Sequence, residues 1–357
     1  MANNKEVLLS VKNLCQHFRL DARTVNKAVD NVSFDIYKGE VFGLVGESGC
    51  GKTTTGRSII KLYDITSGSV FFKGQRICAG TKSYKDAIAE AKKELRKCSD
   101  PDRVAELKKI IEDNRAEIKS AQADHKHASR KLVNEIQMIF QDPNASLDPR
   151  MTVRDIIAEG LYIKGVKDKA YIEEKVFEML ETVGLVREHA SRYPHEFSGG
   201  QRQRIGVARS LIMEPSLIIA DEPISALDVS IRAQVINLLN DLRHNLGITI
   251  LFIAHDLSVV KYFSDRIGVM YYGKMVELAD SEELFRHPLH PYTRSLLSAI
   301  PQPDPNYEKN RKRIVYNPLA DHDYRNSQPS FREVTPGHFV LCNDEEFERY
   351  QKIVEET

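Results

Sequence analysis

The glycine-rich stretch GLVGESGCGKTTTG, residues 43–56, constrains the fold of this chain most. It contains the pattern G-x4-G-K-T as Gly46, Gly51, Lys52 and Thr53. An apolar strand is expected directly before it and a helix over about 52–62 directly after it, which is the context of a phosphate-binding loop. The glycines let backbone amides wrap a diphosphate, Lys52 reaches the terminal phosphates, and Thr53 offers a hydroxyl to Mg²⁺. The sequence therefore predicts the strand–loop–helix unit of an α/β phosphate-binding protein.

A second candidate phosphate site lies far from this loop, in FSGGQRQRIGVARSL at residues 197–211. Ser198 is a favourable N-cap, and apolar residues recur after it at helical spacing, so a helix is expected to begin at Ser198–Gly200. The first amides of a helix lack backbone partners and the peptide dipoles sum there, which attracts anions. The chain thus carries two candidate phosphate-binding segments that are well separated in sequence.

Polar side chains also follow two apolar strands further along the chain. The stretch PSLIIADEPISALD, residues 215–228, predicts a buried strand that runs into two carboxylates, and ITILFIAHD, residues 248–256, predicts one that ends at a histidine. Helices expected over about 152–164, 169–183 and 230–245 alternate with these strands, which predicts a largely parallel sheet with its ligand at the carboxyl ends. The residues expected to converge there are Gly46, Asp221, Glu222 and His255.

These residue types suit the hydrolysis of a nucleoside triphosphate. Transfer of the γ-phosphoryl group to water needs a positioned water, a metal ion and dispersed positive charge. We expect Asp221 to hold Mg²⁺ through its water shell, Glu222 to polarise the attacking water, and His255 to bond the γ-phosphate or to fix that water. Acidic residues that merely leave a strand would explain either carboxylate alone, but not all three groups beside a phosphate loop.

Composition sets the class of protein. The chain has 357 residues with 51 Lys plus Arg and 51 Asp plus Glu, so no global charge points to a nucleic-acid partner. The start MANNKEVLLSVKNL lacks the apolar stretch of a signal peptide, and no window approaches the roughly 20 apolar residues that span a bilayer. Five cysteines without a CxxC pair suit a reducing cytoplasm. These features predict a soluble intracellular protein.

The segment 81–130 interrupts the α/β pattern. It is charged and helix-prone, and the sequence SDP breaks it, with Ser99 or Asp100 as the cap and Pro101 at the first helical position. Its apolar residues form only a narrow stripe, which predicts a helical hairpin with one weakly buried face. The stripe consists of Val104, Leu107, Ile111 and Ile118. A partner-binding element and a solvated insertion are both compatible with this pattern, which favours the solvated insertion.

The C-terminal region is less informative by residue pattern. The proline-rich stretches HPLHPY and IPQPDPNYEKNRKR predict a linker-like segment followed by a small or poorly packed tail. His287 and His290 could form a metal pair or be turn histidines beside prolines, and the turn is the favoured interpretation.

Taken in order, these motifs resemble those of ATP-binding cassette (ABC) subunits. The stretches GESGCGKTT, QDP with Gln141, FSGGQ, LIIADEP, SALD and IAHD correspond to the Walker A, Q-loop, signature, Walker B, D-loop and H-loop motifs. The stretches YPHEFSGGQRQRIGVARSL and HPLHPYTRSLLSAIPQPDP resemble the oligopeptide/dipeptide importer ATPases, the F-type subunit above all. The resemblance covers nearly the whole chain except roughly 81–130.

The resemblance implies a fold, a domain organisation and a site. The fold is a P-loop nucleotide-binding domain over 5–275 with an antiparallel β subdomain, a helical subdomain and the hairpin insertion at 81–130, followed by a C-terminal extension over 276–357. The cofactors are ATP and Mg²⁺, with Glu222, His255 and Gln141 as catalytic residues and Thr53, Gln141 and Asp221 at the metal. The residues expected to contact nucleotide are Phe18, Gly46, Glu47, Ser48, Gly49, Cys50, Gly51, Lys52, Thr53, Thr54, Ser198, Gly199, Gly200, Gln201 and Asp228.

The resemblance also explains why there are two phosphate-binding segments. In the family the Ser-Gly-Gly helix end binds the phosphate of ATP held by a second cassette, so each chain contributes half of two sites that close head to tail. Because the chain has no expected membrane span, the resemblance implies two membrane-spanning permease subunits and a second, related ATP-binding subunit in a heterodimer. An extracytoplasmic peptide-binding protein would act indirectly, and no nucleic acid is expected.

The resulting hypothesis is an ATPase at the cytoplasmic face of the cell membrane that powers import of oligopeptides or dipeptides. One alternative is a soluble ABC ATPase of DNA repair or translation that uses the insertion as a coiled-coil arm. A helix of about 28 residues extends only some 42 Å, which is short for such an arm, and the chain has a single cassette. The other alternative is an importer ATPase for nickel, glutathione or another small solute, because specificity belongs to other subunits.

Overall fold

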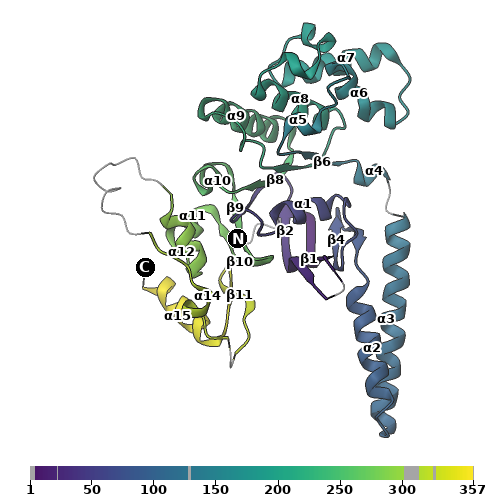
Figure 1. Cartoon of the computed structure of the whole chain (residues 1–357), viewed down its shortest axis with the longest axis vertical. Helices are drawn as coiled ribbons and strands as arrows, with labels where there is room; N and C mark the ends of the chain where they lie inside the picture. Colours follow the sequence, from purple (N-terminus) through teal and green to yellow (C-terminus); the bar gives the residue numbers. More distant parts are fainter. Residues whose placement is uncertain (1–4, 22, 128–129, 301–312, 325–326, 357) are drawn as a thin grey trace. The chain divides into compact units, whose positions relative to one another are not determined.

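The computed structural model describes residues 5–21, 23–127, 130–300, 313–324 and 327–356 (Figure 1). The chain divides into two compact units. The first consists of residues 1–37, 49–133 and 272–274, and the second of residues 38–48, 134–271 and 275–357. Each unit has its own β-sheet, and the two are described in turn.

The first unit is built on a four-stranded sheet in the order β2-β1-β4-β5, whose neighbouring strands are antiparallel. Apolar residues alternate with polar ones along these strands, so one face of the sheet is buried and the other is solvated. Helix α1 follows the glycine-rich loop and packs against β1 and β2. The elements are β1 (Val7–Arg19), β2 (Val25–Tyr37), α1 (Lys52–Ile59), β4 (Ser67–Phe72) and β5 (Gln75–Ala79).

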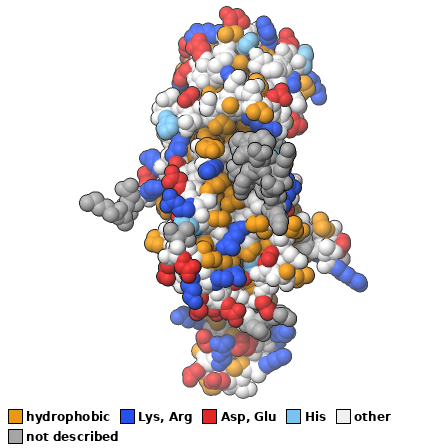
Figure 2. Space-filling view, turned by 90° about the vertical axis from the view of Figure 1, so that its left-hand side faces the viewer, with side chains coloured by type: hydrophobic (Ala, Val, Ile, Leu, Met, Phe, Trp, Pro, Cys, Tyr) orange, Lys and Arg blue, Asp and Glu red, His pale blue; other side chains and the backbone are white. Residues whose placement is uncertain are grey.

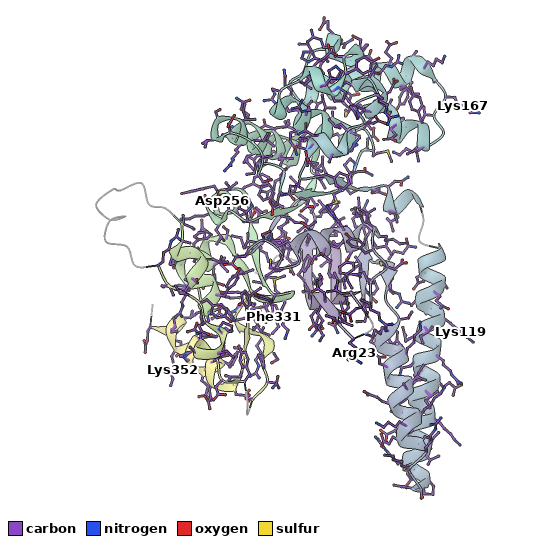
Figure 3. All side chains as sticks on the ribbon, viewed as in Figure 1. Arg23, Lys119, Lys167, Asp256, Phe331 and Lys352 are labelled. Carbon is purple, nitrogen blue, oxygen red and sulfur yellow. The ribbon has the colours of Figure 1, made fainter. Side chains whose placement is uncertain are left out.

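The segment after β5 is the expected helical hairpin. Helices α2 (Lys82–Leu95) and α3 (Pro101–His127) run antiparallel and side by side (Figure 1), and the short α4 (Arg130–Val133) follows. The break between them has the predicted cap, because α3 begins at Pro101 and the Asp100 carboxylate accepts the N–H of Asp102 at 3.1 Å. Charged side chains such as that of Lys119 lie on the exposed side of α3 (Figure 3).

The narrow apolar stripe holds this hairpin together. Leu107 and Ile111 are buried against Ala91 of α2, whereas Val104 and Ile118 are only half-buried. The end of α3 is fastened to β5 by Arg76, a strand residue whose guanidinium is surrounded by acceptors on α3. These acceptors are Glu117 (3.5 Å), Ser120 (2.6 Å) and Asp124 (2.6 Å). The hairpin is therefore solvated along most of its length but anchored to the sheet at its base.

The second unit contains an eight-stranded sheet in the order β11-β12-β10-β9-β3-β8-β7-β6. Its parallel part runs from β9 through β3, β8 and β7 to β6, which confirms the predicted parallel sheet. The strands β3, β7 and β8 are buried along their whole length and read as continuous apolar runs, as parallel strands between helices do. The parallel strands are β3 (Val41–Val45), β6 (Ile136–Ile139), β7 (Leu217–Asp221), β8 (Thr249–Ala254) and β9 (Arg266–Tyr271).

Helices of this unit occur close to where the apolar periodicity places them. The three predicted over 152–164, 169–183 and 230–245 are α6, α7 and α9, and their buried residues share one large core with the sheet. The α-helices up to this point are α5 (Pro143–Ser146), α6 (Val153–Ile163), α7 (Lys169–Thr182), α8 (Gly199–Leu211), α9 (Val229–Leu246) and α10 (Leu257–Phe263). Two 3₁₀ turns, Arg187–Ser191 and Pro194–Glu196, lead into α8.

The C-terminal tail is small, as expected, but it is not poorly packed. Strand β10 (Lys274–Asp280) pairs with β12 (His338–Cys342), which pairs with β11 (Ser330–Thr335), so the tail extends the large sheet. The tail has a separate core of Leu289, Val334, Val340, Cys342 and Tyr350. The remaining helices are α11 (Ser281–Arg286), α12 (Pro291–Ser298), α14 (Pro318–Asp321) and α15 (Asp344–Glu355). Most of the stretch expected to be linker-like, 301–312, lies outside the described residues.

This pairing also bears on the domain boundary expected at 275/276. The eight-stranded sheet contains strands from both sides of that boundary, because β10 lies between β9 and the tail strand β12 in the strand order. Strand β11, with the sequence SFREVT, is mostly polar and has a single buried residue, so its pattern does not indicate a strand.

Among the described residues, no helix combines the length and apolarity that crossing a bilayer requires. On the face drawn in Figure 2, basic and acidic side chains are interspersed. This mixture agrees with the balanced charge of the sequence.

Candidate nucleotide site

Four of the predicted site residues lie at the carboxyl ends of adjacent parallel strands. In the register of the second unit, Val45 pairs with Ala254 and Asp221 pairs with Ile253. Gly46 follows β3 and His255 follows β8, while Asp221 is the last residue of β7 and Glu222 comes next. The predicted convergence of Gly46, Asp221, Glu222 and His255 at one edge of the sheet therefore has its geometric basis in this register.

Glu222 lies at the centre of a small polar network. Its Oε2 atom accepts a hydrogen bond from Nε2 of Gln141 at 3.1 Å and lies 3.1 Å from Nδ1 of His255. Its side chain is 12% exposed, whereas that of His255 is 53% exposed, so the histidine lies on the solvent side of the network. Gln141, two residues after β6, is exposed. The network thus joins residues that follow β6, β7 and β8.

The contact between His255 and Glu222 constrains the tautomer of the histidine. When the carboxylate is ionised it only accepts hydrogen bonds, so Nδ1 of His255 then carries the proton that faces Glu222. In a neutral ring Nε2 is then an acceptor. A bond from His255 to a phosphate therefore requires either the doubly protonated ring or the other tautomer, a point that the residue pattern alone could not decide.

The backbone at Glu222 is itself unusual. Glu222 adopts φ 45°, in the left-handed region that few residues other than glycine occupy. Its N–H donates to the carbonyl of Ile253 on β8 at 2.9 Å, and its carbonyl accepts from the hydroxyl of Ser225 at 3.0 Å. Such strain persists where surrounding contacts determine the conformation, and it turns the carboxylate at the strand end toward Gln141 and His255.

Asp221 is fully buried at the end of β7. The Asp221 side chain is short and is attached to the last residue of a buried strand, so the strand fixes the position of its carboxylate. A rigid carboxylate suits the role of orienting the water shell of a metal ion.

The glycine-rich loop has the backbone that a phosphate cradle needs. Its glycines Gly46, Gly49 and Gly51 adopt φ values of 150°, 80° and 106°, which L-residues with a side chain rarely adopt. Gly51 is the N-cap of α1, so no side chain there blocks the first amides of the helix. Because a Cβ at these positions would be strained and the helix start is uncovered, the loop fits a phosphate chain.

The two halves of this loop fall in different units. Gly46, Glu47 and Ser48 belong to the second unit, and Glu47 donates its backbone N–H to the hydroxyl of Tyr292 at 3.0 Å. Tyr292 was not among the predicted site residues. The part of the sequence that could have identified it is the HPY triplet, which was interpreted only as a turn.

The other half, Gly49–Thr54, belongs to the first unit. Lys52 is buried, and its Nζ lies 3.8 Å from the sulfur of Cys50, while Thr53 and Thr54 are half-buried. Burial raises the pKa of the Cys50 thiol, so this side chain stays neutral beside the ammonium. The Cys50 carbonyl accepts the N–H of Gly273 at 2.9 Å, which fixes the loop against the turn after β9.

Phe18 is half-buried on β1 in the same unit. Its ring meets Tyr63 edge to face, with centroids 5.3 Å apart. Tyr63, which was not identified from the sequence, is therefore a packing partner of the Phe18 ring.

The Ser-Gly-Gly segment forms the predicted helix N-terminus. Ser198 caps α8 by accepting the N–H of Gln201 at 3.3 Å, and Gln201 in return accepts the N–H of Ser198 at 3.0 Å. This reciprocal capping box confirms the expected helix start. Ser198 is exposed, so the end of α8 is open to a ligand.

The glycines after Ser198 are packed against the segment that follows Glu222. A Cβ on Gly200 would lie 2.4 Å from Cγ2 of Ile231 on α9, and one on Gly199 would lie 3.7 Å from Leu227. Asp228 is the N-cap of α9 and is exposed. The signature segment and the Asp228 segment therefore lie side by side in this unit, although some 28 residues separate them.

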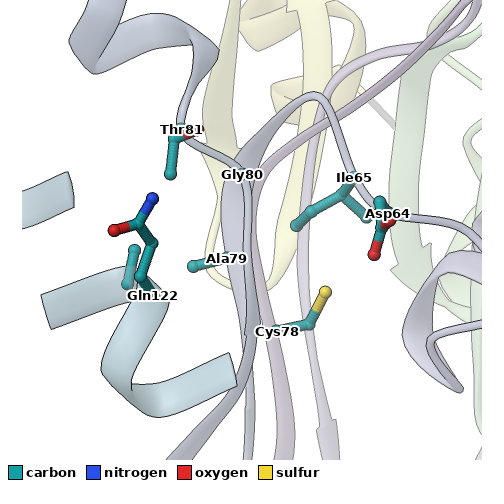
Figure 4. A pocket seen from close by; sticks show the side chains of 8 residues that line it. Asp64, Ile65, Cys78, Ala79, Gly80, Thr81 and Gln122 are labelled. Atoms are coloured by element: carbon teal, nitrogen blue, oxygen red, sulfur yellow. The ribbon is translucent and has the colours of Figure 1, made fainter. Parts of the chain in front are cut away.

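A cavity of about 350 Å³ lies elsewhere, in the first unit between the β5 region and α3 (Figure 4). None of the predicted site residues lines it. Its lining consists of Asp64, Ile65, Cys78, Ala79, Gly80, Thr81, Ala121 and Gln122. It is a gap at the base of the hairpin rather than part of the nucleotide site.

Comparison with known proteins agrees with this geometry. The family model described as "ABC transporter" matches residues 29–225, and the one described as "Oligopeptide/dipeptide transporter, C-terminal region" matches residues 276–324. The chain is 56% identical to the oligopeptide transport ATP-binding protein OppF of Bacillus subtilis, over 97% of this chain and 99% of the relative. It is 49% identical to the dipeptide transport ATP-binding protein DppF of Lactococcus lactis, over 99% of each.

Solved structures share the fold. The ATP-binding cassette MJ0796, in a dimeric post-hydrolysis state bound to ADP and Pi, superposes with a TM-score of 0.57 at 25% identity over 77% of this chain and 99% of that chain. The protein cbiO1 from Clostridium perfringens has a TM-score of 0.57 at 22% identity, over 80% of this chain and 92% of that one, which shows the fold alone. The chain therefore belongs to the ABC transporter family of ATP-binding proteins, in the group that carries the oligopeptide/dipeptide transporter C-terminal region, and it is an ATPase.

Proposed function

We propose that this chain is the subunit whose ATP hydrolysis powers import of oligopeptides or dipeptides across the cell membrane. The observation that carries the proposal is the 56% identity to an oligopeptide transport ATP-binding protein over nearly the full length of both chains, insertion and C-terminal region included. The alternative of a soluble repair or translation ATPase has no comparable support, and the match to the C-terminal region of oligopeptide/dipeptide transporters favours peptides over nickel or glutathione.

In this proposal the first half of the ATP site is made by the glycine-rich loop. The amides of Gly46–Thr54 and the Lys52 ammonium hold the phosphates, and Phe18 supports the adenine. Thr53, Gln141 and Asp221 hold Mg²⁺, which neutralises the charge of the phosphate oxygens. The positive φ values of the loop glycines and the burial of Lys52 and Asp221 support this assignment.

Glu222, His255 and Gln141 act on the water that attacks the terminal phosphate. The carboxylate of Glu222 accepts a hydrogen bond from that water and increases its nucleophilicity. Gln141 and His255 hold the Glu222 carboxylate in place through the two 3.1 Å contacts. When nucleotide is bound, either residue can exchange this contact for one to the nucleotide or the water, so the network links nucleotide binding to the position of the base.

The helix end at Ser198, Gly199 and Gly200 completes the site of a second cassette. Gln201 orders that helix end through the capping box, and Asp228 lies on the adjacent segment, where it would face the same nucleotide. Two membrane-spanning permease subunits and a related, non-identical ATP-binding subunit complete the assembly, and this chain lies peripherally on its cytoplasmic face. An extracytoplasmic peptide-binding protein delivers the substrate.

Co-purification and uptake test this proposal. The tagged chain is isolated from detergent-solubilised membranes, and the assembly that accompanies it is reconstituted into vesicles with ATP inside or outside. Recovery of membrane-spanning partners together with ATP-dependent uptake of a labelled peptide supports the proposal. Recovery of ribosomes or DNA contradicts it, and uptake of nickel or glutathione but not of peptides contradicts the substrate class.

A further inference from the structure

We propose that Tyr292 of the C-terminal region is a positioning residue for the phosphate loop, which it holds through the backbone N–H of Glu47. In this way the C-terminal region sets the affinity of the subunit for ATP. The inference rests on the proposed function of Gly46–Thr54 as the loop that binds the ATP phosphates.

The contact lies at the point where the chain enters the loop. The N–H of Glu47 donates to the Tyr292 hydroxyl at 3.0 Å, and the Tyr292 side chain is almost fully buried. The preceding residue, Gly46, adopts φ 150°. Because glycine has no side chain, its backbone can readily leave this conformation when the loop is not held in place. A hydrogen bond to the peptide unit between Gly46 and Glu47 fixes the orientation of that unit. The amides that follow it are thereby pre-organised for a phosphate chain before ATP arrives.

The tyrosine ring is itself held in a fixed position. It packs against Tyr271, the last residue of β9, with ring centroids 4.4 Å apart, and against Tyr316 at 5.5 Å. Strand β9 is the direct neighbour of β3, the strand that leads into the phosphate loop. The hydroxyl therefore approaches Glu47 from a ring that is fixed against the same sheet that carries the loop.

The start of α12 is also fixed, by a capping histidine. His290 is the N-cap of α12, and its Nδ1 accepts the N–H of Tyr292 at 3.1 Å. Burial lowers the pKa of His290 to about 3, with smaller contributions from the charges of His322 and Arg294. The ring is consequently neutral at physiological pH, so Nδ1 remains an acceptor and the cap is maintained.

A buried carboxylate connects this cap to the sheet. Glu277 on β10 is fully buried, and its two oxygens accept the backbone N–H groups of Leu289 at 2.7 Å and His290 at 3.1 Å. His338 of β12 adds a third contact, with Nε2 2.8 Å from the same carboxylate. These contacts form a continuous series from the tail strands through Glu277 and His290 to Tyr292 and the loop. This series gives the HPY triplet a role beyond that of a turn.

The test removes only the hydroxyl. Tyr292→Phe keeps the ring and its packing, and Tyr316→Phe is the matched control because it removes a hydroxyl from the same aromatic cluster. The dissociation constant for a fluorescent ATP analogue is measured on the full chain, and kcat and KM for ATP on the assembled transporter. Loss of one hydrogen bond that pre-organises the loop should raise the dissociation constant and KM about three- to tenfold, with kcat within about twofold of wild type.

A second measurement reports on the contact directly. Hydrogen exchange of the Glu47 amide should be faster in Tyr292→Phe than in wild type and unchanged in Tyr316→Phe, with the same melting temperature for the two variants within a few degrees. A purely structural role would lower the melting temperature and kcat and leave KM unchanged.

Lys52→Ala separates this inference from the assignment of the loop. If Lys52→Ala loses ATP binding while Tyr292→Phe binds ATP within twofold of wild type, the positioning role is wrong and the phosphate loop stands. If Lys52→Ala retains ATP affinity, the assignment of the loop is itself wrong.

Discussion

Replacement of Glu222 by glutamine isolates the chemistry of the proposed base from its geometry. Both contacts of the carboxylate, to Gln141 and to His255, are made by the same oxygen, Oε2, at 3.1 Å. The amide oxygen of glutamine can take this position and accept from the same two donors. Glutamine has nearly the same volume, and its backbone tolerates φ 45° no worse than glutamate does. The structure therefore predicts that Glu222→Gln leaves the network and ATP binding in place.

The expected loss is then confined to the rate of hydrolysis. An amide oxygen is a far weaker base than a carboxylate, and general-base catalysis typically contributes about 10²- to 10⁴-fold. This range corresponds to about 2.7–5.5 kcal/mol in the activation barrier. Because ATP still binds but is not hydrolysed, the closed dimer of cassettes should accumulate.

The assay compares ATP turnover and ATP affinity in the assembled transporter. Glu348→Gln makes the same change from carboxylate to amide at an exposed residue of α15, so it serves as the matched control and should leave both quantities unchanged. We expect Glu222→Gln to reduce kcat by at least a hundredfold with a dissociation constant for ATP within about threefold of wild type. Hydrolysis near the wild-type rate would remove Glu222 from the catalytic role, and a parallel loss of ATP affinity would mean that the contacts, rather than the base, were disrupted.

Three further predictions concern the split site, the insertion and the C-terminal cap. Lys52→Ala should weaken ATP binding at this chain's own loop, whereas Ser198→Arg should leave that binding intact and prevent closure over the partner's nucleotide. Photo-crosslinking of labelled ATP, resolved by subunit, measures both effects. Loss of labelling of its own chain in Ser198→Arg would refute the assignment of Ser198 to the partner's site. Replacing residues 84–128 by a Gly/Ser link should preserve ATP hydrolysis. It should lower the melting temperature, because Arg76 loses its partners on α3. A folded variant that no longer assembles with its membrane partners would instead identify the hairpin as a docking element. His290 has a folded pKa of about 3 against about 6.5 unfolded, so the unfolded state binds the extra proton and stability falls as pH drops through this window, by up to about 1.4 kcal/mol per pH unit. His290→Asn keeps an N-cap that does not titrate, so its melting temperature should fall less than that of wild type between pH 7 and 4.5. An equal fall in the variant and in wild type would show that His290 is not the cause of the pH dependence.

Much of the site follows from local sequence pattern. The apolar runs before Gly46, Asp221 and His255 are long and bounded by polar residues, and such runs form parallel strands when helical segments alternate with them. Carboxyl ends of parallel strands share one edge of a sheet, so the sequence alone predicted that these residues lie at the same edge. The same holds for the start of α8, because Ser198 and Gln201 are three residues apart and their reciprocal hydrogen bonds are local.

Other features depend on contacts between residues that no local pattern connects. The contacts of Gln141 and His255 with Glu222 span 81 and 33 residues, so the meeting of both on one oxygen could not be inferred from spacing. The proline-rich stretches predicted a small or poorly packed tail, yet strand pairing with β10 gives the tail a core of its own.

The sequence by itself determined the parallel strands, the helix starts and the positions of the loop glycines, because periodicity, capping and backbone freedom are properties of neighbouring residues. The tertiary structure alone decided that the Tyr292 hydroxyl meets the Glu47 amide, 245 residues away, and that the base of α3 is fastened to Arg76. Such contacts form only after the sheet has fixed both partners, because their energies are too small to bring distant segments together and depend on distances that the folded chain imposes.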